Sequence, residues 1–333
     1  MVYIYKKVIG NKSYYYLRVS ERRGSKVISK DIAYLGSTIE EVRKKIDKLP
    51  KYKEQIRKAY KTIHSFLESN HFLEKARKLK SKKDNFLRDK TDEVEACKLH
   101  YSTVFNKLDE LTKREILKTY VIEFAYNTAS IEGNTINLEE ARNLLNEGIT
   151  PKDKTLREVY DLQNTERVFF ELLNNKLNDK LNHELVAEIH DKLLENIDNR
   201  KGYRTTDIRV VRSNFDASLG KYVIVDMDLL LKWFNENKGK LHPLVLAIVF
   251  HHKFEKIHPF MDGNGRAGRM IMNFILMKNS FPPTIIHKKT RTEYLEAMRE
   301  ADESGLWKID EKYKDLIDYG IDEFIETYWN IFL

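Results

Sequence analysis

A twelve-residue run at 258–269, HPFMDGNGRAGR, combines residue types that bind phosphate with residue types that move protons. His258 is the side chain of this run that titrates near neutral pH, so it suits a general base for a hydroxyl attacking phosphorus. Asp262 offers hard oxygen ligands of the kind that Mg²⁺ prefers when it also contacts phosphates. These two residues predict proton abstraction beside a phosphate chain.

The glycines and arginines of the same run suit the phosphates themselves. Gly263 and Gly265 permit backbone torsions that other residues resist, just before the expected start of a helix. Successive N–H groups there form an anion nest that the helix dipole reinforces. Arg266 and Arg269 add permanent charge with bidentate geometry for phosphate. A glycine-rich turn alone is weak evidence, but the full combination predicts phosphoanhydride binding.

Buried helices must hold this loop. Apolar residues recur at helical spacing in 242–257 and again in 265–278, so we expect a loop between two core helices. Upstream, Thr112 with Glu115 predicts a capping box that opens a helix ending at Glu132-Gly133.

The run resembles the Fic family signature HPFxDGNGRxxR at every specified position. A match of this length is far more specific than an ordinary short motif. The resemblance covers roughly 112–310. It extends to the lead-in residues His251, Phe254, Glu255 and Ile257, and to Ile189-His190 and Gly202-Tyr203-Arg204 before the flap hairpin that the family carries.

The resemblance implies a protein adenylyltransferase that uses Mg²⁺ and ATP. His258 would deprotonate a Ser, Thr or Tyr hydroxyl, which attacks the α-phosphate while pyrophosphate leaves. Asp262 would hold Mg²⁺. The other site residues would bind phosphate, with Gly263, Asn264 and Gly265 lining the cradle, Arg266 on the phosphate chain and Arg269 on the γ-phosphate.

Gly265 favours AMP transfer within the family. Relatives of the death-on-curing type carry Lys at this position and transfer phosphate instead, with ATP inverted. The phosphocholine-transferring branch stays open on the motif alone.

Thr128, Glu132 and Gly133 fit the family's inhibitory pattern [S/T]xxxE[G/N]. A carboxylate at this helix end can pair with Arg269 and displace the γ-phosphate. The resemblance therefore implies the self-inhibited class, with an inhibitory helix at about 113–132. An alternative is a deAMPylating hydrolase in which Glu132 positions water.

The segment at about 207–225 predicts a β-hairpin, because two β-prone arms flank an Asn/Asp/Gly turn region. In the family this flap pairs with an extended segment of the target protein. Self-modification and a homodimer are also compatible with the resemblance.

The rest of the chain predicts a mainly α fold. Residues 1–36 predict a small antiparallel β-meander, 37–111 a helical arm or linker with a bend at 80–92, and 112–333 the Fic domain. Capping boxes are expected at Thr38 with Glu41 and at Asn137 with Glu140. Further helices are expected at 155–175, 182–197, 227–237, 290–303 and 310–331.

The formal net charge is +8, which leaves room for nucleic acid. We favour solvated helical surfaces instead, and we interpret the tyrosines at 14–16 as alternating sheet residues rather than a stacking platform. A nucleic-acid or partner-binding protein with a vestigial Fic core is the third hypothesis. The intact loop argues against it.

A cytoplasmic protein is expected. Cys97 is the single cysteine, so no intrachain disulfide can form. The chain start lacks the pattern of a signal peptide, and no apolar run reaches the length of a membrane span. We favour structural roles for His251 and Glu255, and the remaining histidines His190, His242, His252 and His287 carry no specific signal.

Overall fold

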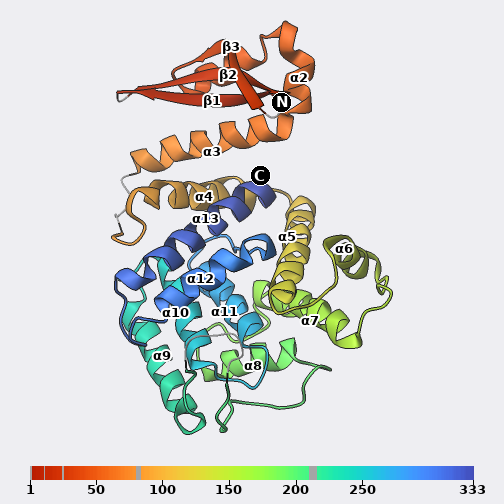
Figure 1. The fold of residues 1–333 in the computed structure, drawn as a ribbon, viewed down its shortest axis with the longest axis vertical. Coiled ribbons are helices and arrows are strands. Elements are labelled where there is room, and N and C mark those ends of the chain that lie inside the picture. The colour runs from red at the N-terminus through yellow and green to blue at the C-terminus, as the bar shows by residue number, and fades with distance from the viewer. Residues whose placement is uncertain (1, 11, 25, 80–83, 210–215) are drawn as a thin grey trace.

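A computed structural model of the chain describes residues 2–10, 12–24, 26–79, 84–209 and 216–333. Most of these residues lie in helices, and one three-stranded antiparallel sheet stands at the N-terminal end (Figure 1). The predicted mainly α fold with a small β-meander is confirmed. No helix in these ranges is both long and apolar enough to cross a membrane.

The sheet consists of β1 (Val2–Ile9), β2 (Lys12–Arg23) and β3 (Lys26–Gly36), paired in the order β1-β2-β3. Alternate residues point to opposite faces of a strand, and here one face supplies the apolar side chains. That face packs on α1 (Ile39–Ile46) and α3 (Tyr60–Lys78) in a small core of its own. The sheet therefore rests on the helices that follow it, as a sheet this small requires.

A helical arm connects the sheet to the remainder of the chain. Thr38 caps α1 by accepting a hydrogen bond from the Glu41 backbone N–H at 3.2 Å. The predicted capping box is only half formed, because the Glu41 carboxylate accepts from the Ser37 N–H at 2.9 Å rather than from Thr38. The arm continues through η1 (Pro50–Tyr52), α2 (Lys53–Lys58) and α3 to η2 (Arg88–Lys90) and α4 (Thr91–Thr103). α3 and α4 run side by side (Figure 1). The predicted bend at 80–92 falls between them, although residues 80–83 lie outside the described residues.

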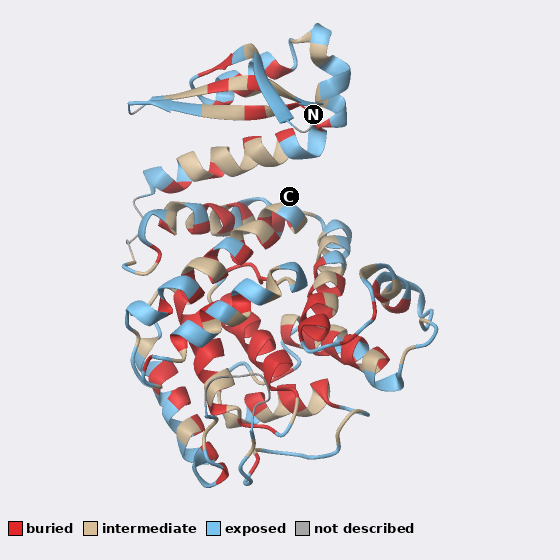
Figure 2. Cartoon of the chain, in the orientation of Figure 1, coloured by how far each residue is buried: buried red, intermediate tan, exposed pale blue. Residues whose placement is uncertain are grey.

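The helices of the C-terminal part surround α10 (Pro243–Ile257) and α11 (Asn264–Lys278). Both central helices are buried on nearly every side, and their apolar residues form much of the largest core (Figure 2). The surrounding elements are η3 (Phe105–Lys107), α5 (Glu110–Ile131), α6 (Leu138–Glu147), α7 (Leu156–Leu173), α8 (His183–Leu193), η4 (Gly220–Tyr222), α9 (Val223–Asn237), η5 (Lys288–Thr290), α12 (Arg291–Ala301), η6 (Glu311–Tyr313) and α13 (Lys314–Ile331).

Two of the helix starts test the predicted caps. Asn137 and Glu140 form the predicted capping box at α6. At α5 the predicted cap is wrong, because the helix begins at Glu110 and the Asp109 carboxylate accepts from the Thr112 N–H at 3.0 Å. An Asp satisfies the free N–H groups of a first turn as well as a Thr does, so the sequence offered two adequate caps.

The predicted hairpin at 207–225 is wrong in its described parts. Residues 207–209 and 216–219 form no strand, and α9 already begins at Val223. Residues 210–215, the centre of the predicted flap, lie outside the described residues. Val223, Met227 and Leu230 are buried on one face of α9, so burial at helical spacing outweighs the β-propensity of the Val-Ile-Val run.

Candidate active site

The loop between α10 and α11 holds His258 in a left-handed conformation, with φ 54° and ψ 62°. The imidazole Nδ1 lies 3.3 Å from the Glu255 carbonyl oxygen, so Nδ1 carries the proton and donates it. The Nε2 atom is then the basic nitrogen. Burial lowers the pKa of His258, which keeps the ring neutral near pH 7. This is the state that a general base needs.

Asp262 follows four residues later and is ionised. Its Oδ1 accepts from the Gly263 N–H at 2.6 Å and lies 3.3 Å from Arg266 Nη2, while Arg157 binds Oδ2. Burial by itself would raise the pKa of Asp262, but the charges of Arg266 and Arg157 outweigh it and lower the pKa.

These features fit a carboxylate ligand of Mg²⁺, an ion that usually fills most of its coordination positions with phosphate oxygens and water. The described residues contain no group of three or more His, Cys, Asp or Glu side chains arranged for a metal. A Mg²⁺ ion held by Asp262 would therefore take a single carboxylate from the described residues. The Arg157 side chain is more than half exposed, so it can leave Asp262 at low cost.

Gly263 and Gly265 shape the start of α11. Gly263 has φ 77°, and a Cβ there would lie 2.5 Å from Leu194 Cδ2. A Cβ at Gly265 would lie 2.0 Å from Glu132 Oε1. Both glycines thus allow close approach of another group to the backbone N–H groups of the helix start.

Asn264 has a different environment from the one its predicted role requires. Its Oδ1 accepts from the Phe260 N–H, and its Nδ2 donates to the Phe260 carbonyl, each at 2.9 Å. The side chain is buried and closes the loop on itself. We therefore assign Asn264 to the shape of the cradle rather than to direct phosphate contact.

Arg266 is buried between two carboxylates. Nη1 pairs with Asp161 of α7, and Nη2 faces Asp262. Its Nε has no hydrogen-bond partner among the described residues. Sequence reasoning missed both Asp161 and Arg157, which lie about a hundred positions before the loop and belong to no motif around it.

Arg269 lies beneath the end of α5 and is 1% exposed. Its Nη2 pairs with Glu132 Oε1 at 2.6 Å, and its Nε donates to Thr128 Oγ1 at 2.7 Å. Gly133 has φ 102° and ends the helix directly after Glu132. The structure thus brings together the three residues of the inhibitory pattern and Arg269.

Arg204 ties the loop to the segment on either side of residues 210–215. Its Nε donates to the His258 carbonyl at 2.7 Å, and Nη2 reaches the Ile257 carbonyl at 3.2 Å. The same guanidinium donates to the Thr206 carbonyl at 2.8 Å and to the Ser218 carbonyl at 2.5 Å. Sequence reasoning noted Arg204 only as part of the resemblance and assigned it no role.

His190 supports the other side of the loop. Its ring stacks on Phe260 with centroids 3.6 Å apart, and its Nε2 donates to the Asp262 carbonyl at 3.0 Å. Sequence reasoning assigned His190 no specific signal. A lone histidine on α8 carries none until the fold places it beside the loop.

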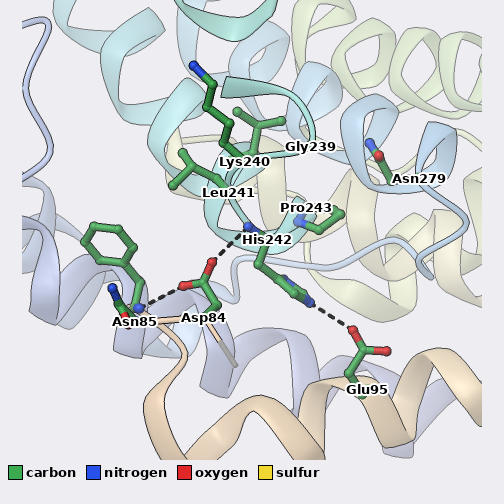
Figure 3. Close-up of a pocket in the computed structure, with 11 residues that line it drawn as sticks. Asp84, Asn85, Glu95, Gly239, Lys240, Leu241, His242, Pro243 and Asn279 are labelled. Carbon is green, nitrogen blue, oxygen red and sulfur yellow. Dashed lines mark hydrogen bonds and ion pairs between the residues drawn. The ribbon is translucent and has the colours of Figure 1, made fainter. Parts of the chain in front are cut away.

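A separate hollow of about 460 Å³ lies at the opposite end of α10 (Figure 3). His242 caps that helix end and is itself held by Glu95, 3.1 Å from Nε2, and by Asp84, 3.0 Å from its backbone N–H. α10 has 15 residues, so this hollow lies roughly 20 Å from the loop. It is not part of the candidate active site.

Comparison with known proteins gives the site its family. Residues 180–276, which include the loop up to and beyond Arg269, match the model of the Fic/DOC family. This stretch of the chain is similar to a Fic domain. It contains α10, the loop and most of α11, and thus every residue from His258 to Arg269.

The matches to named relatives cover only part of the length of those relatives. The protein adenylyltransferase fic-1 of Caenorhabditis elegans is 32% identical over 203 residues, which is 59% of this chain and 40% of that protein. The protein adenylyltransferase Fic of Drosophila grimshawi is 30% identical over 198 residues, 58% of this chain and 40% of that protein. The chain thus spans about two fifths of the relatives it matches.

Solved structures agree on the fold. A Fic domain containing signaling protein from Bacteroides thetaiotaomicron superposes with a TM-score of 0.64 at 22% identity, over 71% of this chain and 94% of that one. Fic-1 from C. elegans superposes with a TM-score of 0.60 at 25% identity, over 74% of this chain and 70% of that one.

Proposed function

We propose that this chain is a protein adenylyltransferase that moves AMP from ATP to a Ser, Thr or Tyr hydroxyl of a protein. The observation that carries the proposal is the composition of one loop: a neutral His258 with Nε2 as its basic nitrogen, an ionised Asp262 and the N-terminus of α11. The relatives named as protein adenylyltransferases support the same chemistry.

In the proposed reaction, His258 Nε2 takes the proton of the target hydroxyl. The hydroxyl oxygen forms a bond to the α-phosphorus, and the bond from that phosphorus to the bridging oxygen breaks. Pyrophosphate leaves, and the proton on His258 returns to solvent. Arg266, Arg269 and the N–H groups of the helix start would hold the phosphates, and Mg²⁺ bound at Asp262 would add positive charge beside them.

We infer that this arrangement is self-inhibited. The Glu132 carboxylate pairs with Arg269 at 2.6 Å and lies against the backbone at Gly265. A γ-phosphate that needs Arg269 must first displace this carboxylate. Two negative groups cannot share one guanidinium without repulsion, so ATP would bind in a productive pose only after Glu132 moves.

One observation favours the hydrolase as a second candidate function. The Glu132 side chain is 42% exposed although its partner Arg269 is buried. A carboxylate that is accessible and adjacent to the phosphate cradle could orient water toward an AMP ester. Removal of AMP from a modified protein that depends on Glu132 would support this function.

The target would approach as an extended segment beside residues 204–218, where the family's flap lies. Self-modification, a homodimer and a cytoplasmic location remain predictions from the sequence and its resemblance. The predicted boundaries of the β-meander, the helical arm and the Fic domain also remain predictions.

The deciding experiment compares wild type, Glu132→Gly and Glu132→Gly/His258→Ala with ATP labelled at the α-phosphate, Mg²⁺ and a lysate of the source cells. We expect strong protein labelling by Glu132→Gly, weak labelling by wild type and none by the double variant. ATP labelled at the γ-phosphate should give no more protein labelling with Glu132→Gly than with the double variant, which corrects for kinases in the lysate. Extra γ-label with Glu132→Gly would overturn AMP transfer, and equal α-labelling by the first two proteins would overturn self-inhibition.

A further inference from the structure

The face of the N-terminal sheet that points away from α1 and α3 carries tyrosines and basic residues. Its cross-strand neighbours are Tyr5 with Tyr16, Lys7 with Tyr14, Tyr3 with Arg18, and Tyr16 with Tyr34. All these side chains are at least partly exposed. We call the set the tyrosine face: Tyr3, Tyr5, Tyr14, Tyr16 and Tyr34 with Lys7 and Arg18.

The opposite face of the same strands explains how the sheet folds. Tyr15 and Leu17 are buried there and pack on the helices. The run at 14–16 is therefore an alternating set, as predicted, with Tyr15 inside and its two neighbours outside. The outer tyrosines suit a strand and pair across it, yet an antiparallel sheet usually carries ordinary polar residues on its outer side.

Cations lie directly beside these rings. The Arg18 guanidinium lies 3.5 Å from the Tyr5 ring centroid, and Lys45 Nζ lies 5.0 Å from that of Tyr34. The rings of Tyr16 and Tyr34 are neighbours with centroids 5.4 Å apart. The face thus alternates flat π-surfaces with positive charge.

The strands also hold most of the net charge of the chain. Residues 1–36 contain eight Lys and Arg residues against two acids, a net charge of +6 in a chain whose total is +8. Of the two acids, Asp31 pairs with Arg18 at 2.6 Å. By the strand register, Lys7, Lys12, Arg18 and Arg22 lie on the tyrosine face together with Asp31. A ligand on this face would therefore meet a positive potential.

We propose that the tyrosine face binds single-stranded nucleic acid, a property beyond AMP transfer. The proposal reverses the interpretation of Tyr14 and Tyr16 from sequence alone, because the sheet brings them together with tyrosines of both neighbouring strands. Unpaired bases would stack on the tyrosine rings, while Lys7, Arg18 and the other basic residues of the strands would contact phosphates. Duplex DNA hides its base faces inside the helix and cannot use the rings. An acidic peptide could use the charge but has no flat group for a row of tyrosines.

The position of the sheet leaves both sites accessible at once. Figure 1 shows the strands at one end of the molecule, with α3 and α4 between them and the helices that carry the Fic loop. Binding at the tyrosine face would therefore hold the transferase on a nucleic acid without covering its phosphate cradle. Proteins associated with that nucleic acid would then be the nearest targets.

The first test uses the full chain and fluorescence anisotropy with a labelled oligothymidylate of about 12 nucleotides. We expect binding at about 50 mM salt that weakens steeply by about 200 mM, because phosphate contacts release counterions. The same sequence as a duplex should bind more weakly. Failure to bind the single strand at low salt, or tighter binding of the duplex, would overturn the proposal.

Matched variants separate stacking from charge. Tyr16→Thr/Tyr34→Thr keeps strand-favouring residues and should weaken binding by about tenfold or more, since each stacked base contributes substantially. Tyr60→Ala, on α3 and 62% exposed, is the control and should leave affinity unchanged. Lys7→Gln should lower the salt slope by about one. If the tyrosine variant binds as wild type does, the rings do not stack bases and the proposal is wrong.

A second readout places the ligand directly. Photocrosslinking with a bromouracil oligonucleotide followed by trypsin should label the peptide Ser13–Arg18, SYYYLR. Crosslinks confined to residues 112–333, or equal competition by polyglutamate, would contradict the assignment. AMP transfer by Glu132→Gly is measured separately and should survive the tyrosine substitutions, so failure of either proposal can be recognised without the other.

Discussion

Burial and one hydrogen bond give His258 the protonation state that the proposed proton transfer requires. The bond from Nδ1 to the Glu255 carbonyl, 3.3 Å long, assigns the tautomer. Burial lowers the pKa of the ring and keeps it neutral. The left-handed backbone at His258 is a position that few non-glycine residues occupy, and the bonds from Arg204 to this loop hold it there.

The pH dependence of transfer should follow this neutral histidine. The base works only when unprotonated, and its pKa lies below the ordinary 6.5. We therefore expect the rate of Glu132→Gly to be flat above that value and to fall as pH drops through the lowered pKa of His258. Initial rates across the acid range, with His64→Gln on α3 as control, check this. A midpoint above 7 would contradict a neutral buried base.

Glu255 is a second residue whose burial has a measurable consequence. It lies inside the core near Glu132 and Arg269, and burial raises its pKa from 4.5 to about 8. Its Oε1 has no hydrogen-bond partner among the described residues. A neutral carboxyl at pH 7 fits the structural role that the sequence favoured for this residue.

This pKa predicts how stability depends on pH. Because the folded pKa is raised, Glu255 contributes its full stability below about pH 4.5, and that contribution is lost as pH rises through about 8. Glu255→Gln cannot ionise and should not show this loss. The free energy of unfolding of the variant should therefore rise relative to that of wild type as pH increases from about 4.5 to about 8. Denaturant melts at several pH values measure the difference. A difference that does not change with pH would show that Glu255 is ionised in the native state.

At the scale of elements, one guanidinium connects the residues that flank 210–215 to the loop after α10. Arg204 donates to two carbonyls of the catalytic loop and to Thr206 and Ser218. Hydrogen bonds from a charged group to buried carbonyls are stronger than neutral ones, and Lys cannot reproduce their fork geometry. The segment beside which we propose that the target binds and the loop at 258–269 therefore share a support.

Arg204→Lys should weaken that support without removing the charge. We expect the transfer rate of Glu132→Gly to fall by about 10- to 100-fold, from the loss of about 1.5–3 kcal/mol of charged hydrogen bonding. ATP binding, read from the thermal shift with Mg²⁺ and ATP, should change little. Arg200→Lys is the matched control, because Arg200 pairs with Asp198 at the surface. Equal losses in both variants would exclude a specific role for Arg204.

At the scale of the whole molecule, the chain has separate cores. The sheet with α1 and α3 forms one cluster, and the helices around α10 and α11 form the largest. α3 meets α4 and α13 through a small group that includes Phe72 and Ala96. The sheet can therefore lose stability without disturbing the catalytic loop.

Leu17→Ala tests this separation. Leu17 is fully buried in the sheet core, so the change should destabilise that part by about 2–5 kcal/mol. AMP transfer by Glu132→Gly/Leu17→Ala should remain near that of Glu132→Gly, while hydrogen exchange in residues 2–36 should accelerate. Loss of transfer together with loss of the sheet would show that the two cores unfold as one unit.

The sequence by itself determined what is local. The loop at 258–269 lies between two apolar runs, and its twelve residues include the histidine, aspartate, glycines and arginines from which a general base, a metal ligand and phosphate binding were predicted. The pairing of Glu132 with Arg269 also followed, although only through the resemblance. The meander, most helices, the cap at Thr38 and the capping box at Asn137 with Glu140 were predictable, because turn signals and periodicity act over a few residues.

Tertiary structure alone decided the rest. Arg266 is 105 positions from its partner Asp161, and no spacing rule joins them. Arg204 and His190 acquire roles only because α8 and the segment after it pack beside the loop. At 223–225 packing on the helical core outweighed a β-prone run and made helix. Local propensities amount to less than about 1 kcal/mol per residue, so the burial of a whole helix face overrides them.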